Sequence, residues 1–127
     1  MTQLTDAQHE MLQEYLQLLA GMREGFDYIE ENLTEEAPPQ VAQIFQDLIK
    51  AFEQVHKTHS QLLVIFQDEP KVIELVEECK QLVEQLSTWF EVESNEAKQQ
   101  LLANKVNPSF REWQQKMEQF VQAYIAH

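Results

Sequence analysis

The chain has 127 residues and a net charge of −13, because 22 acidic side chains outnumber 9 lysines and arginines. Such a charge repels the phosphates of nucleic acids and acidic lipids, so we expect no nucleic acid and no membrane as a partner. The length suits one domain, which we expect to cover residues 1–127. Two glycines and four prolines are few turn-forming residues, which indicates long helices.

Three features bear on the cellular compartment. Cys79 is the only cysteine, so no intrachain disulfide can form, which suits a reducing environment. The first ten residues are polar and lack the basic start of a signal peptide. The longest apolar run, Leu62–Phe66, is far too short to span a membrane. We therefore expect a soluble cytoplasmic protein.

The first helix is predicted from about Thr5, a residue type that favours helix N-termini, to about Leu33. Apolar residues recur there at spacings of three and four, which is typical of a helix that packs one face against neighbours. The stripe consists of Met11, Tyr15, Leu18, Met22, Phe26, Ile29 and Leu33.

The second helix is predicted to begin at Pro38–Pro39, because proline is well accommodated in a first helical turn. Its apolar positions alternate in steps of four and three, like the seam of a helical bundle. They are Val41, Phe45, Leu48, Phe52, Val55, His59, Leu62 and Phe66.

The third helix is predicted to start near Pro70, and its end has two interpretations. Either the helix continues with a bend to about Asn104, or Ser94 caps a separate short helix. We favour the continuation. The apolar stripe consists of Val72, Val76, Cys79, Val83, Leu86 and Phe90, widened by Leu75, Leu82 and Trp89.

The fourth helix is predicted to follow a break in the segment NKVNPSFRE. Pro108 favours a helix start, and Ser109 with Glu112 fits a capping box, with Asn107 as the alternative cap. One face then carries Phe110, Trp113, Met117, Phe120 and Tyr124. Four amphipathic helices with short connections predict an all-α, antiparallel up-down four-helix bundle.

The turns of this bundle set the register of its helices. Antiparallel pairing about a turn near residues 68–69 places His59 beside residues 78–79. The same reasoning about the turn near residue 36 places His59 beside residues 11–15. We therefore predict one layer that contains His59, Cys79, and Met11 or Tyr15.

This layer has a functional and a structural interpretation. His59 and Cys79 could form a nucleophilic pair or half of a metal site. Alternatively, His59 is a core histidine bonded to the Tyr15 hydroxyl or a backbone carbonyl, beside an ordinary buried cysteine. We favour the structural interpretation, because no glycine-rich turn supplies the oxyanion-stabilising group that a nucleophile needs.

His56 completes the set of candidate metal ligands, which is His56, His59 and Cys79. The spacing of Glu53 and His56 matches the Glu-x-x-His element of di-iron bundles. Glu53 faces away from the seam, however, and the inward positions of the third helix are apolar or cysteine. We expect no cofactor and no enzymatic activity.

Gly21 and Gly25 lie inside the first helix, where each costs about 1 kcal/mol relative to alanine. One interpretation is close approach of a neighbouring helix, or room for a ring such as Phe52 or Trp113. The other is a bend, or a groove that admits a partner.

The run Leu62–Phe66 is apolar around the whole helix, although a bundle buries only one face. If the third helix is long, the fourth is too short to cover the end of the bundle near the second turn. Leu63, Val64, Ile65 and Ile73 would then form a surface for a dimer or another protein. The alternative is that the chain ends or the start of the first helix cover them.

The function that these features favour is a non-enzymatic protein–protein interaction module, of an adaptor or chaperone-like kind, with a protein partner or a homodimer. The alternative is a bundle that binds a small ligand or a metal at the His59 layer.

Overall fold

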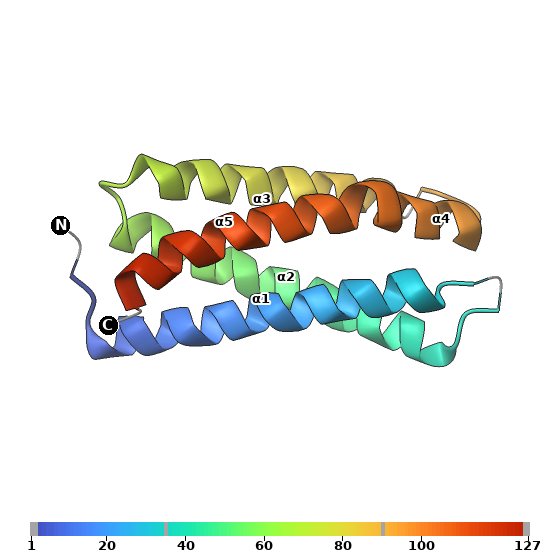
Figure 1. Cartoon of the computed structure of the whole chain (residues 1–127), viewed down its shortest axis with the longest axis horizontal. Helices are drawn as coiled ribbons and strands as arrows, with labels where there is room; N and C mark the ends of the chain where they lie inside the picture. The colour runs from blue at the N-terminus through green and yellow to red at the C-terminus, as the bar shows by residue number, and fades with distance from the viewer. Residues whose placement is uncertain (1–2, 35, 90, 126–127) are drawn as a thin grey trace.

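The fold is described from a computed structural model, in which residues 3–34, 36–89 and 91–125 are placed. All regular elements within these ranges are helical, which confirms the predicted all-α four-helix bundle (Figure 1). The elements are α1 (Asp6–Asn32), α2 (Pro39–Ile65), α3 (Pro70–Trp89), α4 (Asn95–Leu101), the π-helical turn η1 (Leu102–Val106) and α5 (Asn107–Ile125).

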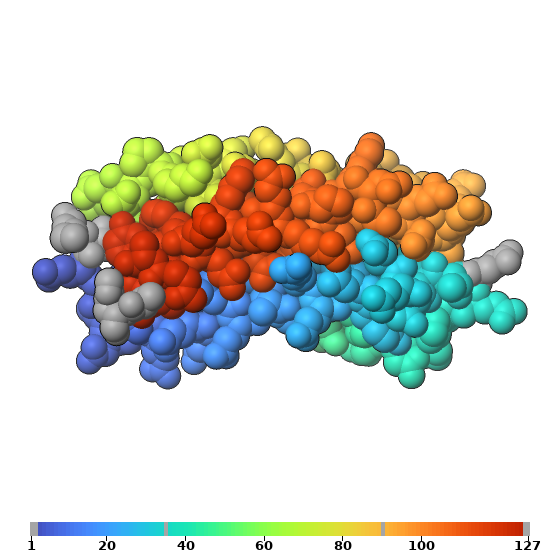
Figure 2. All heavy atoms as spheres, viewed as in Figure 1, coloured from blue at the N-terminus to red at the C-terminus, as the bar shows by residue number. Residues whose placement is uncertain are grey.

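The helices alternate in direction, and α4, η1 and α5 run together as the fourth arm of the bundle (Figure 1). α1 packs against α2 and α5, and α5 also packs against α3. In the space-filling view, α5 lies between α1 and α3 and covers the core from that side (Figure 2). α2 and α3 make far fewer contacts with each other than α1 makes with α2.

The first helix begins as the sequence predicts. The Thr5 hydroxyl accepts a hydrogen bond from the Gln8 backbone N–H at 3.1 Å, and the Gln8 side chain accepts one from the Thr5 N–H at 2.9 Å. This reciprocal pair satisfies two backbone donors that the helix itself leaves unpaired.

The favoured continuation of the third helix is wrong, and the alternative is correct. α3 ends at Trp89, and Ser94 caps α4 by accepting a hydrogen bond from the Ala97 N–H at 3.1 Å. The indole N–H of Trp89 donates a hydrogen bond to the Lys98 carbonyl at 3.2 Å, which links the end of α3 to α4. The predicted core residue Phe90 lies outside the described residues.

The predicted break before the fourth helix is also wrong. The chain stays helical through η1, where the Asn107 N–H bonds to the carbonyl of Leu102, five residues earlier. This wider turn directly precedes Pro108, which has no N–H to continue a regular α-helix. Asn107 is not a cap: its side-chain amide donates to Glu30 at 2.9 Å, and so joins α5 to α1.

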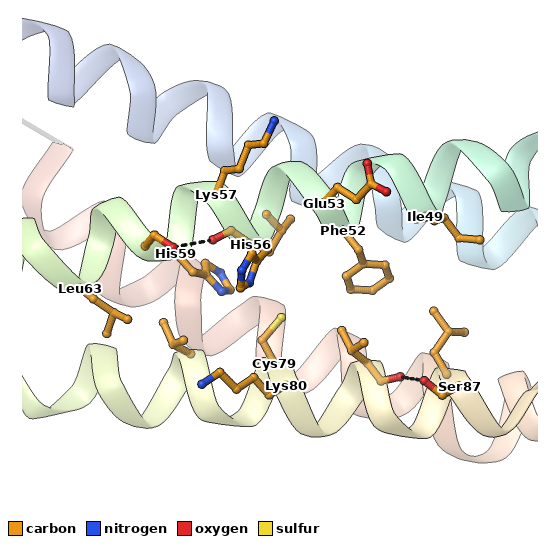
Figure 3. Close-up of a pocket in the computed structure, with 15 residues that line it drawn as sticks. Ile49, Phe52, Glu53, His56, Lys57, His59, Leu63, Cys79, Lys80 and Ser87 are labelled. Carbon is orange, nitrogen blue, oxygen red and sulfur yellow. Dashed lines mark hydrogen bonds between the residues drawn. The ribbon is translucent and has the colours of Figure 1, made fainter.

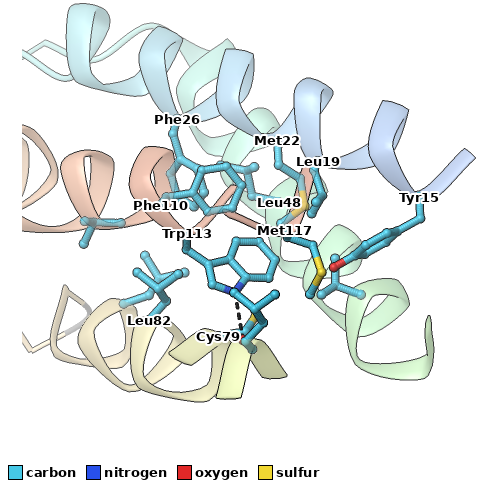
Figure 4. Close-up of a cluster of buried hydrophobic side chains, with 14 of the residues drawn as sticks. Tyr15, Leu19, Met22, Phe26, Leu48, Cys79, Leu82, Phe110, Trp113 and Met117 are labelled. Carbon is cyan, nitrogen blue, oxygen red and sulfur yellow. Dashed lines mark hydrogen bonds between the residues drawn. The ribbon is translucent and has the colours of Figure 1, made fainter. Parts of the chain in front are cut away.

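The core is one cluster of buried side chains contributed by α1, α2, α3, η1 and α5 (Figure 4). The stripe of α1 is rotated slightly from the predicted one. Leu12, Leu16 and Leu19 are buried, whereas Met11 and Leu18 are half-buried. On α3, Val83 was predicted to be in the core but is 41% exposed.

The two glycines of α1 differ in their surroundings. A Cβ atom at Gly25 would lie 3.2 Å from the Leu48 side chain, so close approach of α2 explains this glycine. At Gly21 a Cβ atom would meet nothing within 4 Å. The atoms nearest to a Cβ atom at Gly25 belong to Leu48 and Ile44, so neither Phe52 nor Trp113 is the residue that makes room necessary there.

Within the described ranges, every helix is too short or too polar to cross a membrane.

Candidate functional site

The predicted layer of the bundle forms around His59. The Tyr15 hydroxyl and His59 Nε2 are 2.7 Å apart in a buried hydrogen bond between α1 and α2. The Trp113 ring from α5 meets the His59 ring edge-on at 5.8 Å, and its indole N–H donates to the Leu75 carbonyl of α3 at 2.8 Å. Of the two residues that the register allowed, Tyr15 is therefore the partner of His59, and Met11 is not.

Burial keeps the polar groups of this layer neutral. It lowers the pKa of His59 to about 4, with a smaller contribution from neighbouring His56. It also raises the pKa of the Tyr15 phenol well above its usual value, and raises the pKa of the Cys79 thiol to about 12. A thiol with such a pKa stays protonated at neutral pH, so Cys79 is a poor nucleophile and a poor metal ligand.

The three candidate metal ligands line one groove but do not form a metal site. His56, His59 and Cys79 all lie along the space between α2 and α3 (Figure 3). Nevertheless, the described part of the chain has no group of three or more His, Cys, Asp or Glu side chains arranged to hold an ion. His59 also has one ring nitrogen committed to Tyr15.

This groove, which we call the α2–α3 groove, has a volume of about 870 Å³. Its walls are largely apolar, and its few charged side chains lie along the outer edges of the two helices (Figure 3). The apolar lining consists of Ile49, Phe52, Val55 and Leu63 from α2 and Val76, Cys79, Val83 and Leu86 from α3.

Aromatic residues pack near the two ends of the α2–α3 groove. At one end, the rings of Phe45 and Trp89 stack between the helices at 4.3 Å. At the other end, Phe66 is fully buried against Tyr124 of α5. Between these points the lining from α3 includes the small side chains of Val76, Cys79 and Val83.

The predicted partner surface is only partly exposed, and its residues do not lie together. Leu63 is 38% exposed on the edge of the α2–α3 groove. Val64 is 70% exposed and Ile65 is half-buried, and both line a separate shallow hollow beside Met11 of α1. Ile73 of α3 is 57% exposed and lines neither of these hollows.

The fourth helix was expected to leave the end of the bundle near the α2–α3 turn uncovered, and this expectation is wrong. Because α3 is short and the fourth arm begins early, α5 reaches the turn between α2 and α3. The Tyr124 hydroxyl there donates to Glu69 at 2.9 Å. The exposure of Leu63 therefore goes with its place on the edge of the α2–α3 groove, not with a missing fourth helix.

The sequence did not reveal Ile49 and Val83 as site residues. Ile49 is 38% exposed and Val83 is 41% exposed, and both line the groove. The only signal for Ile49 is that it follows Leu48, so that apolar residues occupy two adjacent faces of α2. Val83 has seam spacing, which predicts burial.

Comparison with known proteins identifies a family. Residues 10–116 match the family described as Domain of unknown function (DUF8042). The chain belongs to this family. The matched range includes both helices of the α2–α3 groove. No curated protein and no solved structure matches the chain.

Proposed function

We propose that the chain is a non-enzymatic protein–protein interaction module that binds an apolar helical surface in the α2–α3 groove. The observation that carries this proposal is the exposure of Ile49, Leu63 and Val83 along one continuous apolar groove. Large exposed apolar side chains gathered in this way are typical of interaction surfaces.

The dimensions of the groove suit a helix. From Ile49 to Leu63 the groove follows α2 for about 21 Å, at 1.5 Å per residue. A helix of three or four turns lying there would place apolar side chains at spacings of three and four into the groove. Its burial would be favourable by about 25 cal/mol for each Å² of apolar surface removed from water.

The chemistry of the buried layer supports a role without catalysis. The Cys79 thiol is protonated because burial raises its pKa to about 12. His59 is neutral and bonded to Tyr15, so it does not present a free base to the groove. We place this activity in the cytoplasm, since a single buried cysteine suits a reducing environment.

A small apolar ligand is the second candidate occupant. The groove volume of about 870 Å³ falls within the roughly 300–1,000 Å³ of ligand sites in proteins. Native mass spectrometry of the purified chain tests this candidate. A bound species that disappears in Val83→Glu would favour a small ligand, and a ligand-free chain would count against it.

Paired glutamate substitutions test the protein-binding function. Val83→Glu places a carboxylate in the groove, whereas Gln13→Glu adds the same charge to an exposed position of α1. We expect Val83→Glu to abolish co-purification of a mass-identified protein with the full chain, and Gln13→Glu to preserve it. Equal recovery with both variants would contradict binding in the α2–α3 groove.

A further inference from the structure

The hydrogen bond between Tyr15 and His59 determines which ring nitrogen of His59 carries the proton. Tyr15 is 3% exposed, and within the described residues its hydroxyl has one hydrogen-bond partner, His59 Nε2 at 2.7 Å. If Nε2 donated instead, the hydroxyl proton would be left unpaired in the core, which is unfavourable. The hydroxyl therefore donates and Nε2 accepts, so the neutral ring holds its proton on Nδ1.

The Nδ1–H group of His59 is a donor that faces the α2–α3 groove. His59 is 4% exposed and lines this groove, and Nδ1 has no partner among the described residues. The described polar side-chain atoms that are both sealed from solvent and unpartnered all belong to α5. Nδ1 is therefore not sealed, and the groove is the hollow that reaches it. Buried donors normally have an acceptor, so His59 offers a hydrogen bond to an occupant.

The surroundings of this donor favour a negatively charged occupant. Cys79 and Lys80 lie opposite His56 across the groove (Figure 3). The Cys79 thiol keeps its proton, because burial raises its pKa to about 12. The charged lining consists of Lys57, Lys80 and Glu53, which is net positive although the chain has 22 acidic and only 9 basic side chains.

We infer that the α2–α3 groove binds a long-chain carboxylate. One carboxylate oxygen would accept from His59 Nδ1–H, and Lys80 on the opposite wall would supply the opposite charge. The aliphatic chain would follow α2 for about 10 Å from His56 to Ile49, past the Phe52 ring (Figure 3). Apolar walls with a few convergent polar groups are typical of small-ligand sites.

This inference goes beyond the proposed protein partner, because it gives the groove a ligand of its own. The carbonyls of a partner helix are bonded within that helix, so its backbone offers no free acceptor to His59. A carboxylate does offer one. The acid and a partner helix would fill the same space, so each should weaken the binding of the other.

Calorimetric titration of the full chain with dodecanoate, kept below its micelle concentration, tests the inference. Dodecanol has the same aliphatic chain without the charge, so it measures the apolar contribution alone. We expect dodecanoate to bind at least about fivefold more tightly than dodecanol. Val83→Glu should abolish the binding of dodecanoate. Equal affinities for the two compounds, or no binding of dodecanoate, would overturn the carboxylate as the ligand.

Charge reversal on α3 separates a local contact from the overall charge of the chain. Lys80→Glu should weaken dodecanoate binding about fivefold or more and leave dodecanol unchanged. Lys71→Glu is the matched control, because Lys71 is an exposed lysine of α3 that does not line the groove. It should leave both affinities unchanged. Equal losses of dodecanoate binding in the two variants would contradict a carboxylate beside Lys80.

Imidazole nitrogen NMR of the full chain observes the donor itself, with the His59 signals assigned by their loss in His59→Gln. Nδ1 should carry the proton, and dodecanoate should shift the Nδ1–H signal and slow its exchange with water. A proton on Nε2, or an Nδ1–H signal unaffected by dodecanoate, would overturn the assigned contact. The comparison of Val83→Glu with Gln13→Glu would still decide whether the groove binds a protein.

Discussion

Burial of the single residue His59 makes the stability of the bundle depend on pH. The pKa of His59 is about 4 in the folded chain, against an ordinary value of 6.5 when unfolded. As pH falls through 6.5 the unfolded chain gains a proton that the folded chain does not, so the folded state loses stability. The loss should reach about 3 kcal/mol near pH 4, at about 1.4 kcal/mol for each pKa unit.

Urea unfolding at pH 7.5 and at pH 4.5 measures this loss, with His59→Gln as the test variant. The groups that face His59 are Tyr15 from α1, Cys79 from α3, Trp113 from α5 and His56 of its own helix. Tyr15 and Cys79 have raised pKa values, so neither ionises in this range. The variant should lose less stability on acidification, whereas exposed His56→Gln should resemble wild type. Equal losses in His59→Gln and wild type would refute the assignment.

The glycines of α1 give a second comparison at the residue scale. Gly21→Ala should raise the free energy of unfolding by up to about 1 kcal/mol, because the new Cβ meets no atom and the helix gains propensity. Gly25→Ala should gain less or destabilise, since Leu48 must move from 3.2 Å. Chemical denaturation of both variants measures the difference, and a larger gain at Gly25 would contradict this packing.

At the scale of elements, the cap of α4 is the feature that separates it from α3. Ser94→Ala should lower the free energy of unfolding by about 1 kcal/mol, because the Ala97 N–H loses its acceptor. Ser109→Ala is the control, since Ser109 lies inside the continuous helix and not at a helix start. Thermal and urea unfolding should show the larger effect at position 94. A larger effect at position 109 would restore the break that the sequence predicted.

The sequence predicted helices well where their ends carry local signals. Thr5, Pro39 and Pro70 mark starts that depend only on nearby residues, and the structure agrees at each. The end of α3 is accompanied instead by a contact with the next helix, from the Trp89 indole to the Lys98 carbonyl. Pro108 resembled a helix start because proline is favoured in a first helical turn, but here it directly follows the π-helical turn of a continuous helix.

At the scale of the whole molecule, the register of the bundle could be predicted but its spacing could not. Turn positions place residues opposite one another, and so His59 contacts Tyr15, one of the two α1 residues that the register allowed. The distance between α2 and α3 is instead a matter of three-dimensional packing, such as the stacking of Phe45 on Trp89 near one end of the groove. Seam spacing does not encode that distance, so Val83 was assigned to the core when it lines an open groove.

We propose that the α2–α3 face is where this chain meets another protein. Site-specific photo-crosslinking in cells tests it most directly, with a photoreactive amino acid at position 83 in the groove or at position 13 on α1. Position 83 should give an adduct, at twice the 15.0 kDa chain mass for a second copy or at another mass for a different protein. Position 13 should give none. No adduct at position 83, or equal adducts at both positions, would contradict the claim.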